Sequence, residues 1–197
     1  MIITYQGNTY FKIQSGSFVL LIDPENSRSF KGANVILNTE KPAAIAPPEK
    51  ETSFFWAENQ GEYEVGGMKI EGWAAGHEDK KTSKAKTDRI ITAYRFKMED
   101  IEIGVIGPIS EEPGPEVLEK LQGVDILILP GSGSPFLKET EAVKLARQIE
   151  PGIVIPSGNG SNKFFRELNQ KPAPQEKLVI KKKELSPGAI SAVCLKS

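Results

Sequence analysis

Histidine is almost missing from this chain: His77 is the only one among 197 residues. Imidazole nitrogens are common ligands of zinc, and a catalytic zinc takes about three protein ligands and keeps one position open for water. A single imidazole cannot build a histidine-rich metal site. Whatever chemistry the protein performs, it performs it with at most one imidazole.

Cysteine is equally scarce. Cys194 is the only one, so no intrachain disulfide can form, and a reducing compartment is expected. Its neighbours Ala192, Val193 and Leu195 are apolar. They predict a strand position, which favours a buried and inert thiol.

The chain also lacks a long apolar run and an excess of charge. The longest apolar runs, such as residues 18–22 and 126–129, are far too short to span a bilayer. The first residues do not read as a basic segment followed by an apolar one, so no signal peptide is expected. The net charge of −1 offers no global attraction for nucleic acid or an anionic membrane. We expect a cytoplasmic protein that binds neither.

The composition that remains is ordinary. At 39% hydrophobic and 26% charged residues, the chain is typical of a globular protein with a sizeable core. Its length fits one large domain or two small ones. We predict a single domain over residues 1–197.

The first half is rich in predicted strands. Short apolar or alternating runs separated by turn residues are typical of strands, and a Gly-Gly pair between two of them indicates a hairpin. The strands are expected at residues 2–5, 10–14, 17–23, 33–37, 54–56, 61–65, 68–75, 89–97 and 101–106. A polar break at residues 38–42 follows one of them, and strand ends are where sites are usually built.

One hydrophilic segment interrupts this pattern. Residues 78–88 read EDKKTSKAKTD, which predicts a lysine-rich loop, either a lid over a site or a solvated excursion. The solvated excursion is the simpler interpretation. No aromatic residue lies among the lysines, which argues against single-stranded nucleic acid.

The second half alternates strands with helices. Apolar residues at helical spacing and a proline at a first turn predict helices. Helices are expected at residues 116–121, 138–150 and 163–169, and strands at residues 125–129, 153–155, 178–182 and 191–195.

In this order, several segments together resemble a known family: ITYQGNTYFKI, LLIDP, ANVIL, QGEYEVGGMKIEGWAAGHED, IGVIGPI, VDILILPGSG and EAVKLARQIEPGIVIPSG. The chain resembles the small metallo-β-lactamase-fold hydrolases, in the branch that includes the ascorbate-6-phosphate lactonase-like proteins. The resemblance runs over nearly the whole chain and depends on segment order. It implies an α/β fold, a four-layer αββα sandwich with a site at one edge of its two sheets.

The resemblance also implies a metal site, from which this chain departs. The family's His-x-His-x-Asp-His motif follows a strand like residues 33–37, and the positions of its ligands are held here by Thr39, Lys41, Ala43 and Ala44. The family's later histidine aligns with His77. Its remaining positions, from the Gly-His near the N-terminus to the last histidine, are held by Asn8, Pro108 and Gly158.

This substitution pattern matters chemically. Alanine, proline and glycine side chains carry no lone pair for a metal, and Lys41 would repel a cation unless it lost its proton. A zinc hydrolase needs the metal to make hydroxide from water at neutral pH. We therefore predict no tightly bound catalytic metal and no cofactor.

Three candidate catalytic residues remain. His77, Glu40 and Lys41 could converge as an acid/base set. The simpler interpretation is a structural histidine and a Glu40–Lys41 salt bridge that replaces the lost metal charge. The predicted ligand pocket is wider and contains Asn8, Asp23, Thr39, Lys41, His77, Pro108, Gly158 and Asn159.

Three functions follow as hypotheses. The first is a metal-free pseudo-hydrolase, not an enzyme, that acts as a binding or scaffold protein, with a small anionic molecule as its ligand. The second is a weak or rebuilt hydrolase that uses His77 with Glu40 or Lys41 on a lactone or phosphodiester. The third is a purely structural subunit with a filled site. A homo-oligomer is compatible with all three.

Overall fold

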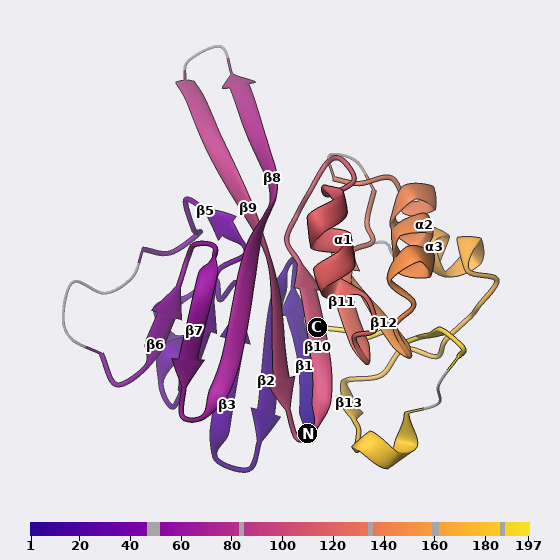
Figure 1. Cartoon of the computed structure of the whole chain (residues 1–197), viewed down its shortest axis with the longest axis horizontal. Coiled ribbons are helices and arrows are strands. Elements are labelled where there is room, and N and C mark those ends of the chain that lie inside the picture. Colours follow the sequence, from indigo (N-terminus) through magenta and orange to yellow (C-terminus); the bar gives the residue numbers. More distant parts are fainter. Residues whose placement is uncertain (47–51, 83–84, 134–135, 159–161, 186–187) are drawn as a thin grey trace.

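The computed structural model describes residues 1–46, 52–82, 85–133, 136–158, 162–185 and 188–197. The side chains of residue 29, residues 77–82 and residues 85–88 lie outside this description. Two sheets face each other, and the helices lie on the outer side of one of them (Figure 1).

The first sheet has six strands, formed mainly by the N-terminal part of the chain. Its order is β13 (Lys177–Val179), β1 (Ile2–Gly7), β2 (Tyr10–Ser15), β3 (Phe18–Ile22), β4 (Val35–Leu37) and β6 (Phe55–Ala57). The strands from β13 to β3 are antiparallel neighbours, whereas β3, β4 and β6 are parallel.

The second sheet has eight strands. Seven of them follow in the order β14 (Ser191–Ala192), β12 (Ile153–Ser157), β11 (Ile126–Pro130), β10 (Ile101–Ile106), β9 (Ala85–Met98), β8 (Met68–Thr82) and β7 (Gly61–Val65). The short β5 (Glu40–Lys41) pairs with β9 beside this path. The strands β10, β11, β12 and β14 are parallel.

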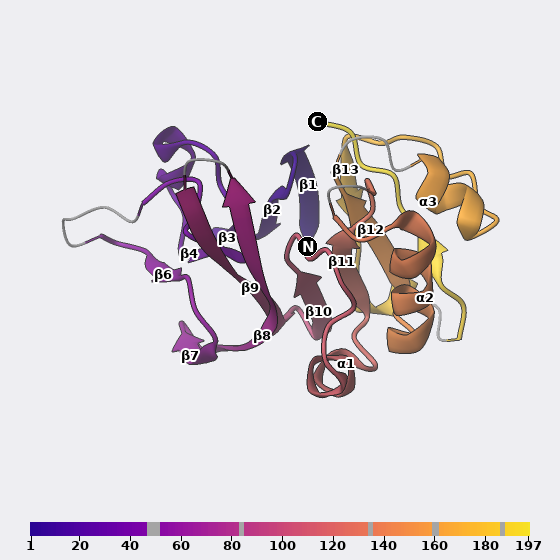
Figure 2. The ribbon, with the colours of Figure 1, turned by 90° about the horizontal axis from the view of Figure 1, so that it is seen from above.

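The helices α1 (Pro115–Leu121), α2 (Glu139–Ile149) and α3 (Asn162–Glu167) cover the outer face of the eight-stranded sheet (Figure 2). Two 3-10 helices, η1 (Ser27–Phe30) and η2 (Lys182–Glu184), complete the regular structure. The predicted helices are confirmed, because a proline at the first turn of α1 and an apolar stripe along α2 determine them locally.

Side chains that alternate between the two faces of each sheet form three hydrophobic core clusters. Leu20 and Ile22 point between the two sheets, where they pack with residues such as Ile128 of the other sheet. Leu21, which lies between them in sequence, points to the opposite face and packs with Phe30 of η1. Successive strand side chains point to opposite faces, so one strand serves two cores.

The third core lies between the eight-stranded sheet and the helices, where Leu127 and Val154 meet Leu145 and Phe164. The predicted α/β sandwich is confirmed. Its outer layer on the six-stranded sheet is built by η1 and by an aromatic cluster of Phe30, Phe54 and Trp56, with no α-helix there in the described chain.

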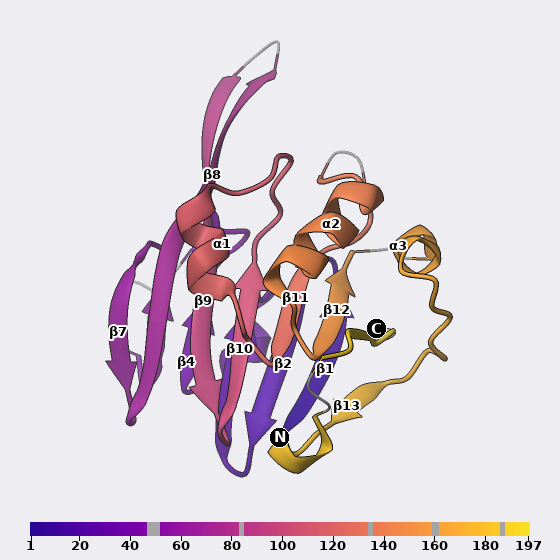
Figure 3. The ribbon, with the colours of Figure 1, turned by 45° about the vertical axis from the view of Figure 1, so that its right-hand side comes forward.

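The loop predicted at residues 78–88 is wrong for the residues that the structure describes. Residues 78–82 continue β8 and residues 85–88 begin β9, and the pairing runs from Glu78 opposite Arg89 to Thr82 opposite Ala85. This β8–β9 arm projects beyond the sandwich (Figures 1 and 3). In a two-stranded antiparallel ribbon, half of the backbone groups pair across the strands and the others face water, so the ribbon needs no buried face and no apolar alternation, which was the signal used for the prediction.

Two predicted strands are also shorter than expected. Residues 178–182 form a strand only up to Val179, and η2 begins at Lys182; residues 191–195 form a strand only over Ser191–Ala192. Both are edge strands, whose ends have one neighbour to pair with and therefore end early. Cys194 lies beyond β14, where partial burial raises the pKa of its thiol.

Candidate active site

The carboxyl ends of several strands meet at one edge of the sandwich. The strands β1, β3 and β4 point toward this edge from the six-stranded sheet, and β10, β11 and β12 point toward it from the other. The two sheets are joined there, because Gly158 after β12 donates its N–H to the carbonyl of Asn8 after β1 at 2.8 Å. The β8–β9 arm rises from the same edge, since β10 ends at Ile106, opposite Ala93 of β9.

Two glycines allow this close approach. A methyl group on Gly107, which follows β10, would lie 2.7 Å from the carbonyl oxygen of Thr39 and 2.7 Å from Ile91. Gly158 has a φ of +89°, and a methyl group there would lie 2.4 Å from the hydroxyl of Ser132. A side chain at residue 107 would therefore displace the backbone of Thr39, and one at residue 158 would be strained by the positive φ and would displace the Ser132 side chain.

Asp23, which follows β3, is half-buried and tightly held by hydrogen bonds. Its carboxylate accepts hydrogen bonds from the backbone N–H of Thr39 at 2.7 Å and from the Thr39 hydroxyl, and Thr9 also hydrogen-bonds it. Burial raises the pKa of Asp23 to about 6, although the Thr39 donors oppose the shift. Its backbone has a φ of +46°, a left-handed conformation that is uncommon for residues other than glycine, although aspartate adopts it more often than most. Such strain is often found at functional sites.

The charge partner of Glu40 is Arg89 rather than Lys41. The guanidinium of Arg89 forms an ion pair with Glu40, and the Arg89 side chain is only 6% exposed. The pair forms because β5 lies against β9, with Glu40 opposite Ile91. Sequence reasoning missed Arg89, since nothing in the chain indicates that a two-residue strand pairs with the base of the arm.

Lys41 lies apart from this pair. Its ammonium donates to the side chain of Asn59 at 3.0 Å, and Lys41 lines neither of the cavities described below. Adjacent residues of a strand point to opposite sides, so Glu40 and Lys41 separate.

The structure does not describe the side chains of two candidate residues, His77 and Asn159. The backbone of His77 pairs with Ile90 in the base of the arm, but its side chain lies outside the described part of the chain, as does Asn159. Whether they reach the edge stays a prediction.

A cavity of about 360 Å³ opens at this edge. It is lined by Asn8, Thr9, Glu40, Pro108, Pro130, Ser132, Phe136, Ser157 and Gly158. It therefore brings together three of the predicted pocket residues, namely Asn8, Pro108 and Gly158. Its volume is within the range of small-molecule sites.

A smaller cavity of about 60 Å³ lies beside it. It is lined by Thr9, Asp23, Pro24, Glu25, Asn38, Glu40, Ala43 and Ala44. Thr9 and Glu40 line both cavities, so the two adjoin. Thr39 is not among the lining residues; its hydroxyl is turned to Asp23. Sequence reasoning did not single out Thr9 or Phe136, whose types are common in turns and cores, whereas Asn38 belongs to the polar break predicted at residues 38–42.

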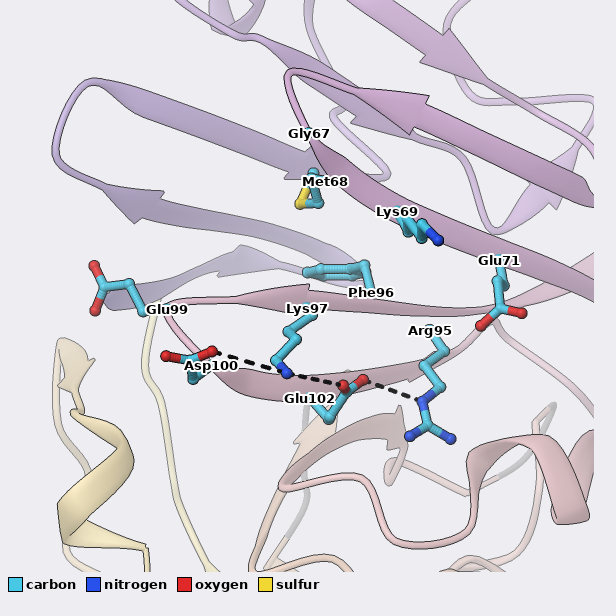
Figure 4. A pocket seen from close by; sticks show the side chains of 10 residues that line it. All are labelled: Gly67, Met68, Lys69, Glu71, Arg95, Phe96, Lys97, Glu99, Asp100 and Glu102. Carbon is cyan, nitrogen blue, oxygen red and sulfur yellow. Dashed lines mark hydrogen bonds and ion pairs between the residues drawn. The ribbon is translucent and has the colours of Figure 1, made fainter.

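Another cavity, of about 630 Å³, lies at the opposite end of the eight-stranded sheet (Figure 4). The Nζ atom of Lys97 lies 3.8 Å from Oδ1 of Asp100 and 3.9 Å from Oε1 of Glu102. Nε of Arg95 lies 3.2 Å from Oε2 of Glu102. Because these charges are paired with one another, they offer a ligand little net field.

The donors at the edge do not fit a hydrolytic zinc. In the described part of the chain, no group of three or more histidine, cysteine, aspartate or glutamate side chains could hold a metal ion. The Thr39 hydroxyl donates a hydrogen bond to the Asp23 carboxylate, and the Glu40 carboxylate forms an ion pair with Arg89. A zinc site needs about three ligands with free lone pairs.

The Beta-lactamase superfamily domain model matches residues 2–157. The chain belongs to this superfamily. No curated protein sequence matches this superfamily member. In the described residues, no helix is long and apolar enough to cross a membrane.

Solved structures of the same fold cover nearly the whole superfamily member. A Thermotoga maritima protein assigned to the zinc-dependent hydrolases of the metallo-β-lactamase superfamily has a TM-score of 0.72 and 17% identity, over 99% of each chain. A metallo hydrolase from the archaeon Ignicoccus hospitalis has a TM-score of 0.62 and 12% identity, over 98% of this chain and 94% of that one.

An isothiocyanate hydrolase from Delia radicum gut bacteria has a TM-score of 0.62 and 12% identity, over 92% of this chain and 100% of that one. At such identities these matches establish the metallo-β-lactamase fold and leave the reaction open.

Proposed function

We propose that this superfamily member is a metal-independent pseudo-hydrolase of the cytoplasm that binds a small molecule at the edge of the sandwich. The observation that carries the proposal is a contrast. The positions of the family's ligands are held by residues such as Ala43, Ala44, Pro108 and Gly158, yet a cavity of about 360 Å³ persists beside them. A purely structural subunit would have no need of this cavity.

The charges at the edge support a binding role over hydrolysis. Zinc hydrolases depend on a cation that lowers the pKa of its bound water. Here the buried cation is the guanidinium of Arg89, which is paired with Glu40. A guanidinium keeps its proton and has no open coordination position, so it stabilises the edge without activating water.

Elemental analysis tests the proposal. Untagged protein is purified after growth with added zinc, manganese and iron, and its metal content is measured by plasma mass spectrometry. Clearly substoichiometric metal supports a metal-independent protein. Nearly one metal per chain, lost in the His77→Ala variant, would overturn it and would mean that undescribed side chains rebuild the site.

A weak hydrolase is the second candidate, favoured by one observation. Asp23 lines the smaller cavity, and its pKa of about 6 suits a general acid or base near neutral pH. In this alternative Asp23 joins His77, while Glu40 is occupied by Arg89 and Lys41 lies outside the cavities. Assays with a lactone and with an activated phosphodiester, with Asp23→Asn as the comparison, separate the two candidates: hydrolysis that this variant lacks selects the enzyme.

A further inference from the structure

We infer that the two adjoining cavities bind a neutral, hydroxyl-bearing small molecule, of which one hydroxyl enters the smaller cavity beside Asn38. The inference rests on the proposed binding function and adds the chemical class of the ligand. It starts from one side chain, Asn38, which is only 3% exposed and whose carboxamide nitrogen has no hydrogen-bond partner in the described part of the chain. Asn38 lines the smaller cavity.

Hydrogen bonds to its backbone groups hold Asn38 in place. Its N–H donates to Ala57 of β6 at 2.8 Å, and its carbonyl accepts from the hydroxyl of Tyr94 at 3.1 Å. The backbone of the residue is thus held between the two sheets at the end of β4. A buried donor that is left unpaired destabilises the protein, so a ligand group that accepts from Asn38 recovers the lost free energy.

The other strongly polar groups of the smaller cavity are acceptors. Asp23, Glu25 and Glu40 contribute three carboxyl groups to its lining. Each has a donor already: Thr39 donates to Asp23, Asn8 donates to Glu25 at 2.6 Å, and Arg89 pairs with Glu40. An ionised carboxylate has about four lone-pair sites, so each can accept from one more donor.

The ligand group must therefore both accept and donate. An ammonium group can donate to Glu40 but cannot accept from Asn38. A carboxylate or phosphate can accept from Asn38 but would face three carboxyl groups, and among the residues that the structure describes no lysine or arginine lines either cavity. A hydroxyl group does both and carries no charge.

The larger cavity fits the rest of such a molecule. Pro108, Pro130 and Phe136 form apolar walls, and Ser132 adds a hydroxyl. Apolar surfaces combined with a few polar groups are typical of sites that hold a small ring while they select its hydroxyl pattern. The volume of about 360 Å³ accommodates one such ring.

Nuclear magnetic resonance of the whole protein tests the inference. The carboxamide signals of Asn38 are followed in ¹H–¹⁵N spectra during titration with three neutral probes, glucose, ribose and inositol. Glucosamine and glucuronate serve as charged counterparts of glucose. We expect at least one neutral probe to shift the Asn38 signals at millimolar concentration and to bind about tenfold more tightly than glucuronate.

Two variants define the contact. Asn38→Ala is expected to weaken binding of the neutral probe about tenfold, whereas Asn59→Ala, which changes an exposed asparagine outside both cavities, is expected to leave it unchanged. The spectra of the unaltered protein do not depend on how well Asn38→Ala folds.

Each opposite outcome overturns the inference. Tighter binding of glucuronate or glucosamine than of every neutral probe would contradict the ligand class and leave the binding function standing. Asn38 signals that no probe shifts would mean that the smaller cavity holds water only. The proposed function itself fails by a different measurement, the presence of stoichiometric metal.

Discussion

Asp23 has several unusual properties. It is half-buried, it has a left-handed backbone, and its pKa is raised from 3.8 to about 6. Glu25 and Glu40 line the same cavity and add negative charge around it. The Asp23 carboxyl group therefore keeps its proton up to about pH 6 in the folded protein, and it is mostly ionised at neutral pH.

Replacing Asp23 should remove a pH dependence of stability. Because the folded pKa lies above the ordinary value, the contribution of Asp23 to stability is complete below about pH 4 and is lost as pH rises through 6. A shift of this size corresponds to about 3 kcal/mol. In urea unfolding, the stability of the Asp23→Asn variant relative to the unaltered protein should therefore increase from pH 5 to pH 8. Asp100→Asn, at an exposed position, is the control; an equal difference at both pH values would contradict the shift.

Gly107 permits the close contact between the sheets at the site. Since a methyl group there would lie 2.7 Å from the Thr39 carbonyl, Gly107→Ala should destabilise the fold by about 1–3 kcal/mol. Gly114→Ala meets nothing within 4 Å and serves as the matched control. Urea midpoints of the two variants measure the difference. Equal midpoints would show that the backbone at residue 107 relaxes freely.

The Arg89–Glu40 ion pair should contribute more to the free energy of unfolding than an ion pair on the surface. A double-mutant cycle with Arg89→Met and Glu40→Gln should give a coupling above about 1 kcal/mol, because Arg89 is buried. The exposed pair of Lys144 and Glu112, 3.1 Å apart, should give about 0.5 kcal/mol or less. Similar couplings would mean that the edge does not depend on the guanidinium.

At the scale of elements, the β8–β9 arm differs from the rest of the sheet. In the sheet, β9 has a neighbour on each side, whereas residues 85–88 pair only with residues 78–82 of β8. A two-stranded ribbon by itself is marginally stable in water. The arm therefore stands on the sandwich without belonging to its core.

Amide hydrogen exchange should separate the arm from the sheet. The amides of residues 78–82 should exchange much faster than those of β10, whose partners on both sides lie within the core. Exchange measured by mass spectrometry on peptides from both regions tests this. Equal protection would indicate that another surface covers the arm in solution.

At the scale of the whole molecule, stability should not depend on metal. The described residues form no metal site, and the edge is held by hydrogen bonds and an ion pair of the chain itself. Adding a chelator such as EDTA should leave the midpoint of thermal unfolding unchanged. A decrease of several degrees, restored by zinc, would show that a metal contributes to folding.

Much of this architecture could be predicted from the sequence, since it follows from local patterns. The apolar run of residues 18–22, the Gly66-Gly67 turn and the stripe of α2 each act over a few neighbouring residues. Segment order was enough for the fold, and single positions such as Ala43 and Pro108 led to the prediction that no catalytic metal is bound. These properties need no knowledge of distant contacts.

Other properties were decided only by the tertiary structure, because they depend on residues far apart in the chain. Arg89 meets Glu40 across 49 positions, and the cavity between β1, β4, β11 and β12 exists only once both sheets face each other. The arm escaped prediction because a two-stranded ribbon needs no buried face, and its sequence therefore shows no apolar alternation. The unpaired amide of Asn38 became visible only when its buried surroundings were known, since burial is a property of the packed molecule.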